Sequence, residues 1–414
     1  MADQLQLVAT TFPGLENVLA QEVRALGGTV TSVGTCVVQF DGDIAMMYRA
    51  NLWLRTALRV LKVLTRFEAR NEDQLYEGTQ SIDWRKHLSV IQTFAVDAVV
   101  HSRRFRHSKY CALKVKDAIV DQFRSTTGHR PSVDAKNPKV RVHLHIAKTR
   151  CSVSLDSSGE SLHRRGYRLE GEKAPLNEVL ASGLIGLSWW DRVKTFVDPM
   201  CGSGTLPLEA ALTGMDIAPG SLGRRFGFQT WREYDQELWR TLLAEAREKR
   251  HPAKNPIVGA DIAPEAVATA RKNAAHCKLG DTLQWQVSPF DKLKPPRGPG
   301  VLIVNPPYGE RLRAVSMDTF YRMMGNTIKH AYKGYAVWVF AAKADALKHI
   351  GLRPTKRIDL LNGPIECKFQ RFEVYQGSPP VSRPSVDAIM HAGKRKKGSW
   401  PGPRPGGGGK SRRR

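Results

Sequence analysis

This sequence contains few cysteines, and no two of them have the spacing of a metal-binding pair. The six cysteines of the 414 residues are scattered and form no Cys-x-x-Cys pair, which argues against a zinc ribbon and a disulfide framework. No stretch approaches the roughly 18 apolar residues of a membrane-spanning helix. The first residues carry acids in place of the basic start of a secretory signal. We therefore expect a monomeric protein of the reducing cytoplasm, with no bound metal and no membrane contact.

Acidic residues are also too few to balance the basic ones. Lys and Arg total 64 against 39 Asp and Glu, which gives a formal net charge of +25. Nine positive charges and no acid lie in the last 24 residues, so an excess of 16 belongs to the rest of the chain. An imbalance of this size is more typical of a nucleic-acid-binding protein than of a merely soluble surface.

The apolar pattern divides the chain into four parts. Residues 1–50 read as a small α/β unit, and residues 51–155 as a second, basic unit with a strand at Thr93–Val100 and a helix over 108–128. That helix has apolar residues at Leu113, Ala118, Ile119 and Phe123, and Gly128 ends it. Residues 156–377 contain a joint and then alternate strands and helices, which predicts an α/β fold with a mostly parallel, doubly wound sheet. Residues 378–414 have little to bury, and we expect them to be disordered.

A glycine loop opens the third part. The strand Thr195–Val197 leads into Asp198 and a loop over 199–204, and a helix begins near Thr205. Gly202 and Gly204 let the backbone approach a ligand closely, and a helix N-terminus favours an anion. The Gly-x-x-x-x-Gly-Lys pattern of a triphosphate loop is missing, as is the third glycine of the dinucleotide fingerprint.

A second strand ends at Asp261, where a carboxylate can accept hydrogen bonds from ribose hydroxyls. It follows Asp198 by 63 residues, much more than the usual spacing of about 20, so an insertion must fill the gap. The insertion contains two arginines and three aromatic residues that we expect either near the site or as packing: Arg224, Arg225, Phe226, Phe228 and Trp231.

A third strand, Val301–Val304, ends in Asn305, Pro306, Pro307 and Tyr308. Its continuous apolar run predicts a central strand covered on both faces. Because the prolines donate no N–H and have a fixed φ, the turn is stiff and its carbonyls stay unpaired. An amide oxygen, a free carbonyl and an aromatic ring therefore converge where α/β sheets bind ligands.

The three motifs together resemble the class I S-adenosylmethionine-dependent amino-methyltransferases. Residues 198–205 are similar to the first motif of that family, and residues 305–312 to its catalytic fourth motif. The joint at residues 154–184 resembles that of the bacterial THUMP-domain RNA guanine-N2-methyltransferases, and the likeness extends over about residues 5–377. Within that group, the 23S ribosomal RNA enzyme in its short form, without a fused second methyltransferase domain, is the most similar.

The resemblance implies a ferredoxin-like unit over 1–50, an RNA-gripping THUMP domain over 51–155 and a Rossmann-like methyltransferase domain. It implies that S-adenosylmethionine lies against Asp198, Pro199, Cys201, Gly202, Ser203, Gly204, Thr205, Asp261 and Ile262, and that Asn305, Pro306, Pro307 and Tyr308 receive guanine N2. The family's acid for the adenine is missing from its usual slot, so Asp291 is the candidate, with Phe290 as an alternative. The RNA contacts we expect are Arg103, Arg104, Lys109, Lys114, Arg164, Arg165, Arg224, Arg225 and Arg311.

Four other functions remain open from the sequence. Transfer RNA could replace ribosomal RNA, since THUMP-like units serve both. A glutamine-directed protein methyltransferase and a DNA adenine-N6 enzyme also fit an Asn-Pro-Pro-Tyr motif, although the basic front part weighs against both. A ribosome-assembly factor that binds RNA without catalysis is the remaining alternative.

Overall fold

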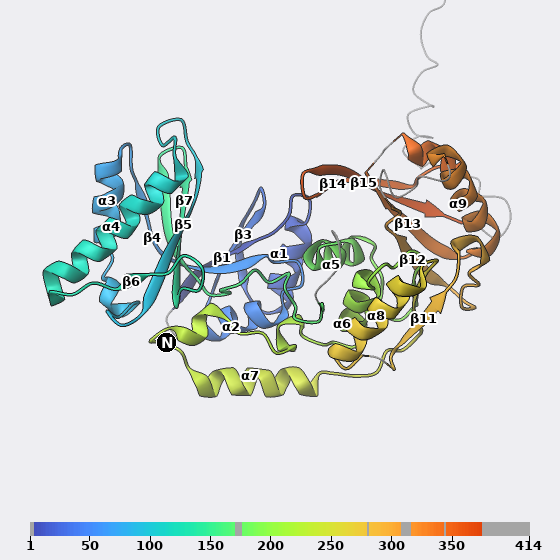
Figure 1. The fold of residues 1–414 in the computed structure, drawn as a ribbon, viewed down its shortest axis with the longest axis horizontal. Helices are drawn as coiled ribbons and strands as arrows, with labels where there is room; N and C mark the ends of the chain where they lie inside the picture. Colours follow the sequence, from blue (N-terminus) through green and yellow to red (C-terminus); the bar gives the residue numbers. More distant parts are fainter. Residues whose placement is uncertain (1–3, 170–175, 280, 308–315, 343–344, 375–414) are drawn as a thin grey trace, which may run out of the picture. The chain divides into compact units, whose positions relative to one another are not determined.

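Two β-sheets carry the fold, and most of their strands are labelled in Figure 1. The computed structural model describes residues 4–169, 176–279, 281–307, 316–342 and 345–374. Tyr308, Arg311 and the basic tail lie outside the described residues. None of the helices within the described ranges is long and apolar enough to cross a membrane.

The first sheet has eight strands in the order β2-β3-β1-β4-β8-β7-β5-β6. All neighbours are antiparallel except β5, which runs parallel to β7 and β6. In this order the strands are β2 (Thr29–Gly34), β3 (Val37–Gly42), β1 (Leu5–Thr10), β4 (Arg59–Glu68), β8 (Arg150–Asp156), β7 (Val140–Ala147), β5 (Thr93–His101) and β6 (Ser132–Val133). Because β1 pairs with both β3 and β4, the two parts expected over 1–50 and 51–155 share one continuous sheet. The expected boundary at residue 50 falls inside α2 (Ile44–Trp53).

Four helices pack on the strands of the first sheet: α1 (Glu16–Ala25), α2, α3 (Glu72–Gln80) and α4 (Ser108–Thr127). Gly128 follows the last residue of α4, as predicted, and has a left-handed backbone with φ of 71°. Of the four apolar residues of this helix noted in the sequence, Ala118, Ile119 and Phe123 are buried, whereas Leu113 is 52% exposed. Cys111 and Val115 belong to the buried face as well.

The second sheet has seven strands in the order β11-β10-β9-β12-β13-β15-β14. The five strands from β11 to β13 are parallel and β15 is antiparallel to both of its neighbours, so the predicted doubly wound sheet is confirmed. In sheet order they are β11 (Leu283–Val287), β10 (Ile257–Asp261), β9 (Thr195–Asp198), β12 (Gly300–Val304), β13 (Tyr335–Ala341), β15 (Ile365–Glu373) and β14 (Lys356–Asn362).

Apolar cores cover both faces of this sheet. One core packs α5 (Glu178–Leu187) and α6 (Thr205–Gly214) on Val301 and Ile303 of β12. The other packs α9 (Met317–Ala331) on Leu302 and Val304. Side chains alternate along a strand, so a strand buried on both sides must be apolar at every position. The prediction of a doubly covered strand is therefore confirmed.

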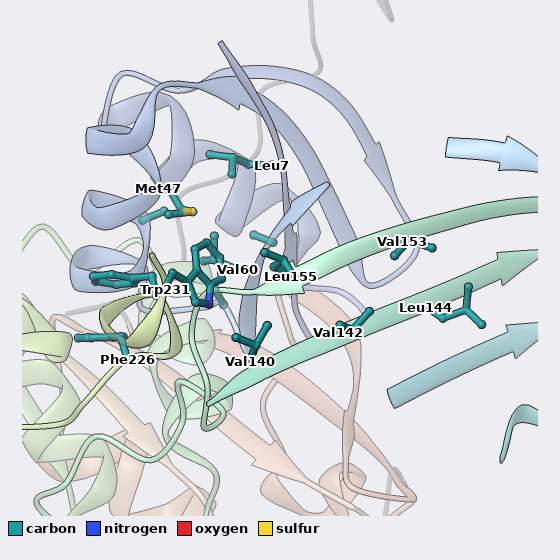
Figure 2. Close-up of a cluster of buried hydrophobic side chains, with 14 of the residues drawn as sticks. Leu7, Met47, Val60, Val140, Val142, Leu144, Val153, Leu155, Phe226 and Trp231 are labelled. Atoms are coloured by element: carbon teal, nitrogen blue, oxygen red, sulfur yellow. The ribbon is translucent and has the colours of Figure 1, made fainter. Parts of the chain in front are cut away.

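The insertion between β9 and β10 belongs to the first sheet's core. It contains two short turns, Pro219–Ser221 and Gly227–Thr230, and helix α7 (Gln236–Glu248). Figure 2 shows Phe226 and Trp231 among the aliphatic side chains of the first sheet, and both residues belong to its core cluster. Phe228 stacks on Tyr48 of α2 with ring centroids 4.3 Å apart. Of the two expectations for these aromatic residues, the structure shows packing.

Candidate cofactor and catalytic site

The glycine loop between β9 and α6 depends on two left-handed residues. Gly202 has a φ of 53° and Gly204 a φ of 85°. A Cβ at Gly204 would lie 2.7 Å from Trp285 Cη2 and 3.0 Å from Ala270 Cβ, whereas a Cβ at Gly202 would meet nothing within 4 Å. Gly204 therefore seats the loop against α8 (Pro264–His276) and β11, while Gly202 leaves open space on the side where a ligand can approach.

The Asp261 carboxylate holds this loop in place. Its Oδ2 accepts a hydrogen bond of 2.9 Å from the Gly202 amide, and its Oδ1 accepts one of 3.0 Å from the Ala263 amide. Each carboxylate oxygen has a second lone pair, so both oxygens can also accept from a ribose diol. Since Asp261 is only half-buried, its carboxylate is open to a ligand. The sequence predicted the ribose contact and missed the tie to the loop.

Asp198 is buried at the end of β9, with 2% of its surface exposed. Its Oδ1 accepts a hydrogen bond of 3.1 Å from the Met200 amide. Burial raises the pKa of the Asp198 carboxyl well above its usual range, and the neighbouring Asp261 charge adds to that rise. Asp198 therefore helps to fix the loop through the Met200 amide, and a cationic ligand close to its carboxyl would favour the charged form.

Four further residues predicted to contact the cofactor, Pro199, Cys201, Ser203 and Thr205, are buried. Their side chains therefore offer little exposed surface to a ligand. Ile262, which directly follows Asp261, is 69% exposed. An exposed apolar side chain next to the carboxylate that we predict to bind a ribose is a suitable surface for a purine ring.

The structure separates the two candidates for the adenine contact. Phe290 is 4% exposed and belongs to the core, with its ring centroid 5.6 Å from that of Tyr332. Its ring is therefore not available as an adenine surface. Asp291 is exposed, and it follows Ser288 by three residues in the chain; the Ser288 amide donates to the Asp261 carbonyl oxygen at 2.9 Å. Asp291 stays a prediction.

The Asn305 turn lies at the same edge of the sheet as the glycine loop. Strand β12 is parallel to β9, with Leu302 opposite Val197, and β9 is parallel to β10. The carboxyl ends of the three strands therefore meet. Asn305 and Pro307 are half-buried and Pro306 is buried. Three of the four predicted catalytic residues thus share an edge with Asp198 and Asp261, while Tyr308 lies outside the described residues.

Arg168 is a residue of the site that sequence reasoning missed. Its guanidinium donates to Glu178 Oε1 at 3.0 Å and to the hydroxyls of Ser203 and Thr205 at 3.4 and 3.2 Å. It also donates to the Leu176 carbonyl oxygen at 3.2 Å. Arg168 therefore links the joint, the start of α5 and the glycine loop. The only signal in the sequence was its place in the joint, where many arginines occur.

The predicted RNA contacts fall into two groups. In the first sheet's domain, Arg103, Arg104 and Lys109 are exposed before and at the start of α4, and the Lys114 ammonium lies 6.0 Å from the centre of the exposed Tyr110 ring. In the joint, Arg165 is 2% exposed and ion-paired with Glu209 at 3.4 Å.

Arg224 is also engaged within the protein. Its guanidinium donates to four backbone carbonyl oxygens, of Ser158, Glu160, Ser161 and Arg164. Arg165 and Arg224 are therefore structural in this fold, and we remove them from the proposed direct RNA contacts.

A doubly wound sheet with a glycine loop, a ribose-type acid and an Asn-Pro-Pro turn at adjacent strand ends defines a class I methyltransferase. Family models agree along the chain: an RlmL ferredoxin-like domain matches residues 6–61, a THUMP domain residues 69–156, and an RMKL-like methyltransferase domain residues 165–371. The chain belongs to the RMKL-like methyltransferase family. The THUMP match adds an RNA-binding domain in front of the methyltransferase domain.

Similar proteins cover nearly all of the described chain. A ribosomal RNA large subunit methyltransferase K/L of Syntrophotalea carbinolica is 38% identical over 95% of this chain. The chain spans 58% of that relative's length. The crystal structure of SMU.472, solved with S-adenosylhomocysteine, has a TM-score of 0.82 at 32% identity and covers 91% of this chain and all of its own. A Listeria monocytogenes structure described as a predicted N6-adenine-specific DNA methylase has a TM-score of 0.82 at 32% identity; the match covers 90% of this chain and 97% of that structure's chain.

Proposed function

We propose that this protein methylates the exocyclic N2 amine of a guanine in 23S ribosomal RNA, with S-adenosylmethionine as the methyl donor. The observation that carries the proposal is the Asn305-Pro306-Pro307 turn at the same sheet edge as the glycine loop and Asp261. The large-subunit ribosomal RNA relatives support the substrate. An RNA substrate and six free thiols fit the cytoplasm, and we propose that the enzyme acts as a monomer.

The residues at the site fit S-adenosylmethionine. Asp261 offers two carboxylate oxygens to the ribose, the open side of Gly202 leaves space for the cofactor, and Ile262 offers an apolar surface to the adenine. Asp291 is the proposed partner of the adenine amino group. When bound, this cofactor supplies an electrophilic methyl group on a sulfonium.

The chain's own residues then act on the amine. The lone pair of a guanine N2 amine is delocalised into the ring, which makes the amine a poor nucleophile. In our proposal its two N–H groups donate to the Asn305 side-chain oxygen and the Pro306 carbonyl oxygen, which favours a tetrahedral nitrogen and frees its lone pair. The nitrogen forms one bond to the methyl group, the sulfonium bond breaks, and one N2 proton leaves to solvent. The stiff turn contributes orientation and fixed dipoles, and Tyr308 is the proposed stacking partner of an extruded base.

The RNA contacts in this proposal are the exposed Arg103, Arg104 and Lys109 and the half-buried Lys114 of the THUMP domain, together with Arg311, which follows the Asn305–Tyr308 motif in the sequence. An exposed aromatic ring beside basic side chains, as at Tyr110, is a common arrangement on surfaces that bind unpaired nucleotides. The basic groups supply a salt-sensitive attraction to phosphates.

Nucleoside mass spectrometry tests the proposal directly. The protein is incubated with S-adenosylmethionine and, separately, with unmodified 23S RNA, transfer RNA and duplex DNA. We expect N2-methylguanosine in 23S RNA alone. The same product in transfer RNA would mean that transfer RNA is the substrate. N6-methyladenine in DNA would mean that the protein is a DNA adenine methyltransferase. The absence of any methylated nucleoside would favour a protein-glutamine substrate or a non-catalytic assembly role.

The Asn305→Ala variant tests the catalytic turn. Because Asn305 acts on the amine and not on the cofactor, turnover should fall at least 100-fold while the affinity for S-adenosylhomocysteine, measured by calorimetry, stays unchanged. Asn362→Ala, on β14, is the matched control and should retain full activity. Equal loss of turnover and cofactor affinity in Asn305→Ala would contradict the proposed role.

A further inference from the structure

A basic cavity of about 830 Å³ lies beside the joint. Four segments line it: residues 160–169 of the joint, the start of α5, the turn Leu222–Arg225 of the insertion, and the end of α8 at His276. Volumes of 300–1,000 Å³ are typical of sites for small organic groups, so this cavity can admit a nucleotide. It is separate from the Asp261 and Asn305 residues of the site described above, none of which lines it.

Positive charge dominates the cavity. Five arginines and two glutamates line it. Both acids are already paired, Glu160 with Arg164 at 3.4 Å and Glu178 with Arg168 at 3.0 Å. Burial, and after it the charges of the surrounding arginines, lowers the pKa of the His163 imidazole to about 4. The cavity therefore carries an uncompensated positive charge of the kind that attracts an anion.

The arginines differ in what they can offer a ligand. Arg165 and Arg224 donate to carbonyl oxygens within the protein, so they contribute charge and hold the wall in place. Arg225 is exposed and makes no hydrogen bond or ion pair with any of the described residues. Arg164 is exposed too, with 66% of its side chain open and one long ion pair at the surface. Such a surface pair contributes little, so both guanidiniums can turn to an incoming anion.

The cavity also adjoins the glycine loop. Arg168 lines the cavity and donates to the hydroxyls of Ser203 and Thr205. A ligand in the cavity therefore lies one side chain away from the loop. Leu169, which is 40% exposed, adds an apolar surface against which a sugar or base can pack.

We propose that this cavity binds a phosphodiester and its nucleoside from the RNA substrate strand, with Arg164 and Arg225 as the phosphate-binding groups. The inference rests on the proposed function for its ligand. It places the RNA across the joint as well as on the THUMP domain. The strand is thereby anchored beside the glycine loop while the target base enters the Asn305 turn.

The test compares RNA binding by the full-length protein and the variants Arg164→Gln and Arg225→Gln over a range of salt concentrations. Arg240→Gln, an exposed arginine on α7, is the control with the same change of charge. Fluorescence anisotropy with an unmodified 23S RNA fragment gives the affinity. We expect each cavity variant to lower the slope of log K against log salt by about 0.7, the value for one lost phosphate contact on a single strand. Arg240→Gln should keep the slope of the unsubstituted protein.

Two further readouts separate the possible failures. Affinity for S-adenosylhomocysteine should stay unchanged in both cavity variants, and a loss there would mean that the cavity holds the cofactor's carboxylate, which overturns the inference. An unchanged salt slope in both variants would also overturn it. If the unsubstituted protein makes no methylated nucleoside while the cavity variants still lower the slope, the proposed function fails and the RNA-binding cavity stands.

Discussion

Asp261 offers the sharpest test of the cofactor site, because one carboxylate serves both the loop and the proposed ribose contact. Asp261→Ala leaves the amides of Gly202 and Ala263 without their partner. Hydrogen bonds to a charged group are worth about 1.5–3 kcal/mol each. Asp261 is half-buried, so water can replace part of what the two amides lose. We therefore count one hydrogen bond at the lower figure and expect the free energy of unfolding to fall by about 1.5 kcal/mol.

The expected loss of cofactor affinity is larger. Asp261→Ala removes two ribose hydrogen bonds and loosens the loop, together about 3 kcal/mol, which corresponds to roughly 100-fold in Kd. Asp261→Asn keeps one carbonyl oxygen and gains two N–H donors that face amide donors, so we expect a loss of about 10-fold. Calorimetric titration with S-adenosylhomocysteine measures both values. Asp281→Ala, an exposed acid before β11, is the control and should bind normally.

The result that would refute this reasoning is specific. If Asp261→Asn binds S-adenosylhomocysteine as tightly as the unsubstituted protein, the carboxylate is not the ribose acceptor. If Asp261→Ala loses stability but no cofactor affinity, Asp261 serves the loop alone. RNA affinity measured by anisotropy should be unchanged in both variants, because neither proposed RNA surface contains this residue.

Three further predictions follow from single residues. Gly204→Ala should lower the free energy of unfolding by about 2 kcal/mol or more, since a left-handed alanine costs about 1–2 kcal/mol and its Cβ would crowd Trp285. The control Gly298→Ala, with a φ of 98° and nothing within 4 Å of the added Cβ, should show only the backbone cost. Equal losses of stability in the two variants would contradict the crowding at Gly204. Arg168→Gln should lower both the melting temperature and S-adenosylhomocysteine affinity, because Glu178, 5% exposed, loses its counter-charge; additive effects in a double-mutant cycle with Glu178→Gln would count against the ion pair. Burial lowers the pKa of His143 to about 4, so its contribution to the free energy of unfolding is full above pH 6.5 and is lost as the pH falls toward 4. His143→Gln should therefore reduce the stability difference between pH 7.5 and 5 by at most about 2 kcal/mol. Identical denaturant midpoints for both proteins at pH 5 and at pH 7.5 would refute this prediction.

The cofactor and catalytic motifs could be predicted from the sequence because their signals are local. A strand buried on both faces is apolar at every position, as Val301 to Val304 are, and the residue after such a strand must lie at the sheet's edge. Gly202 and Gly204 do have left-handed backbones, which is the reason that glycine stands there. The expected helix at Thr205 and the expected end of strand β10 at Asp261 are confirmed for the same reason.

The sequence could not predict which arginines are available. Arg164, Arg165, Arg224 and Arg225 look alike in the chain, and only two of them remain exposed. Arg165 is buried because the fold brings the backbone carbonyl oxygen of Arg55, 110 residues away, to accept a hydrogen bond from its guanidinium. Arg224 is engaged because its turn folds back on the joint.

The local sequence thus determined which chemical groups stand at the strand ends of the second sheet. Apolar runs, left-handed glycines and strand-end polar groups are each set by residues close together in the chain. Only the tertiary structure decided that β1 and β4 join two expected units into one sheet, that the insertion's aromatic rings fill the first core, and that Arg168 reaches the glycine loop. These features depend on contacts between segments far apart in the chain, and such contacts exist only once the apolar faces have packed.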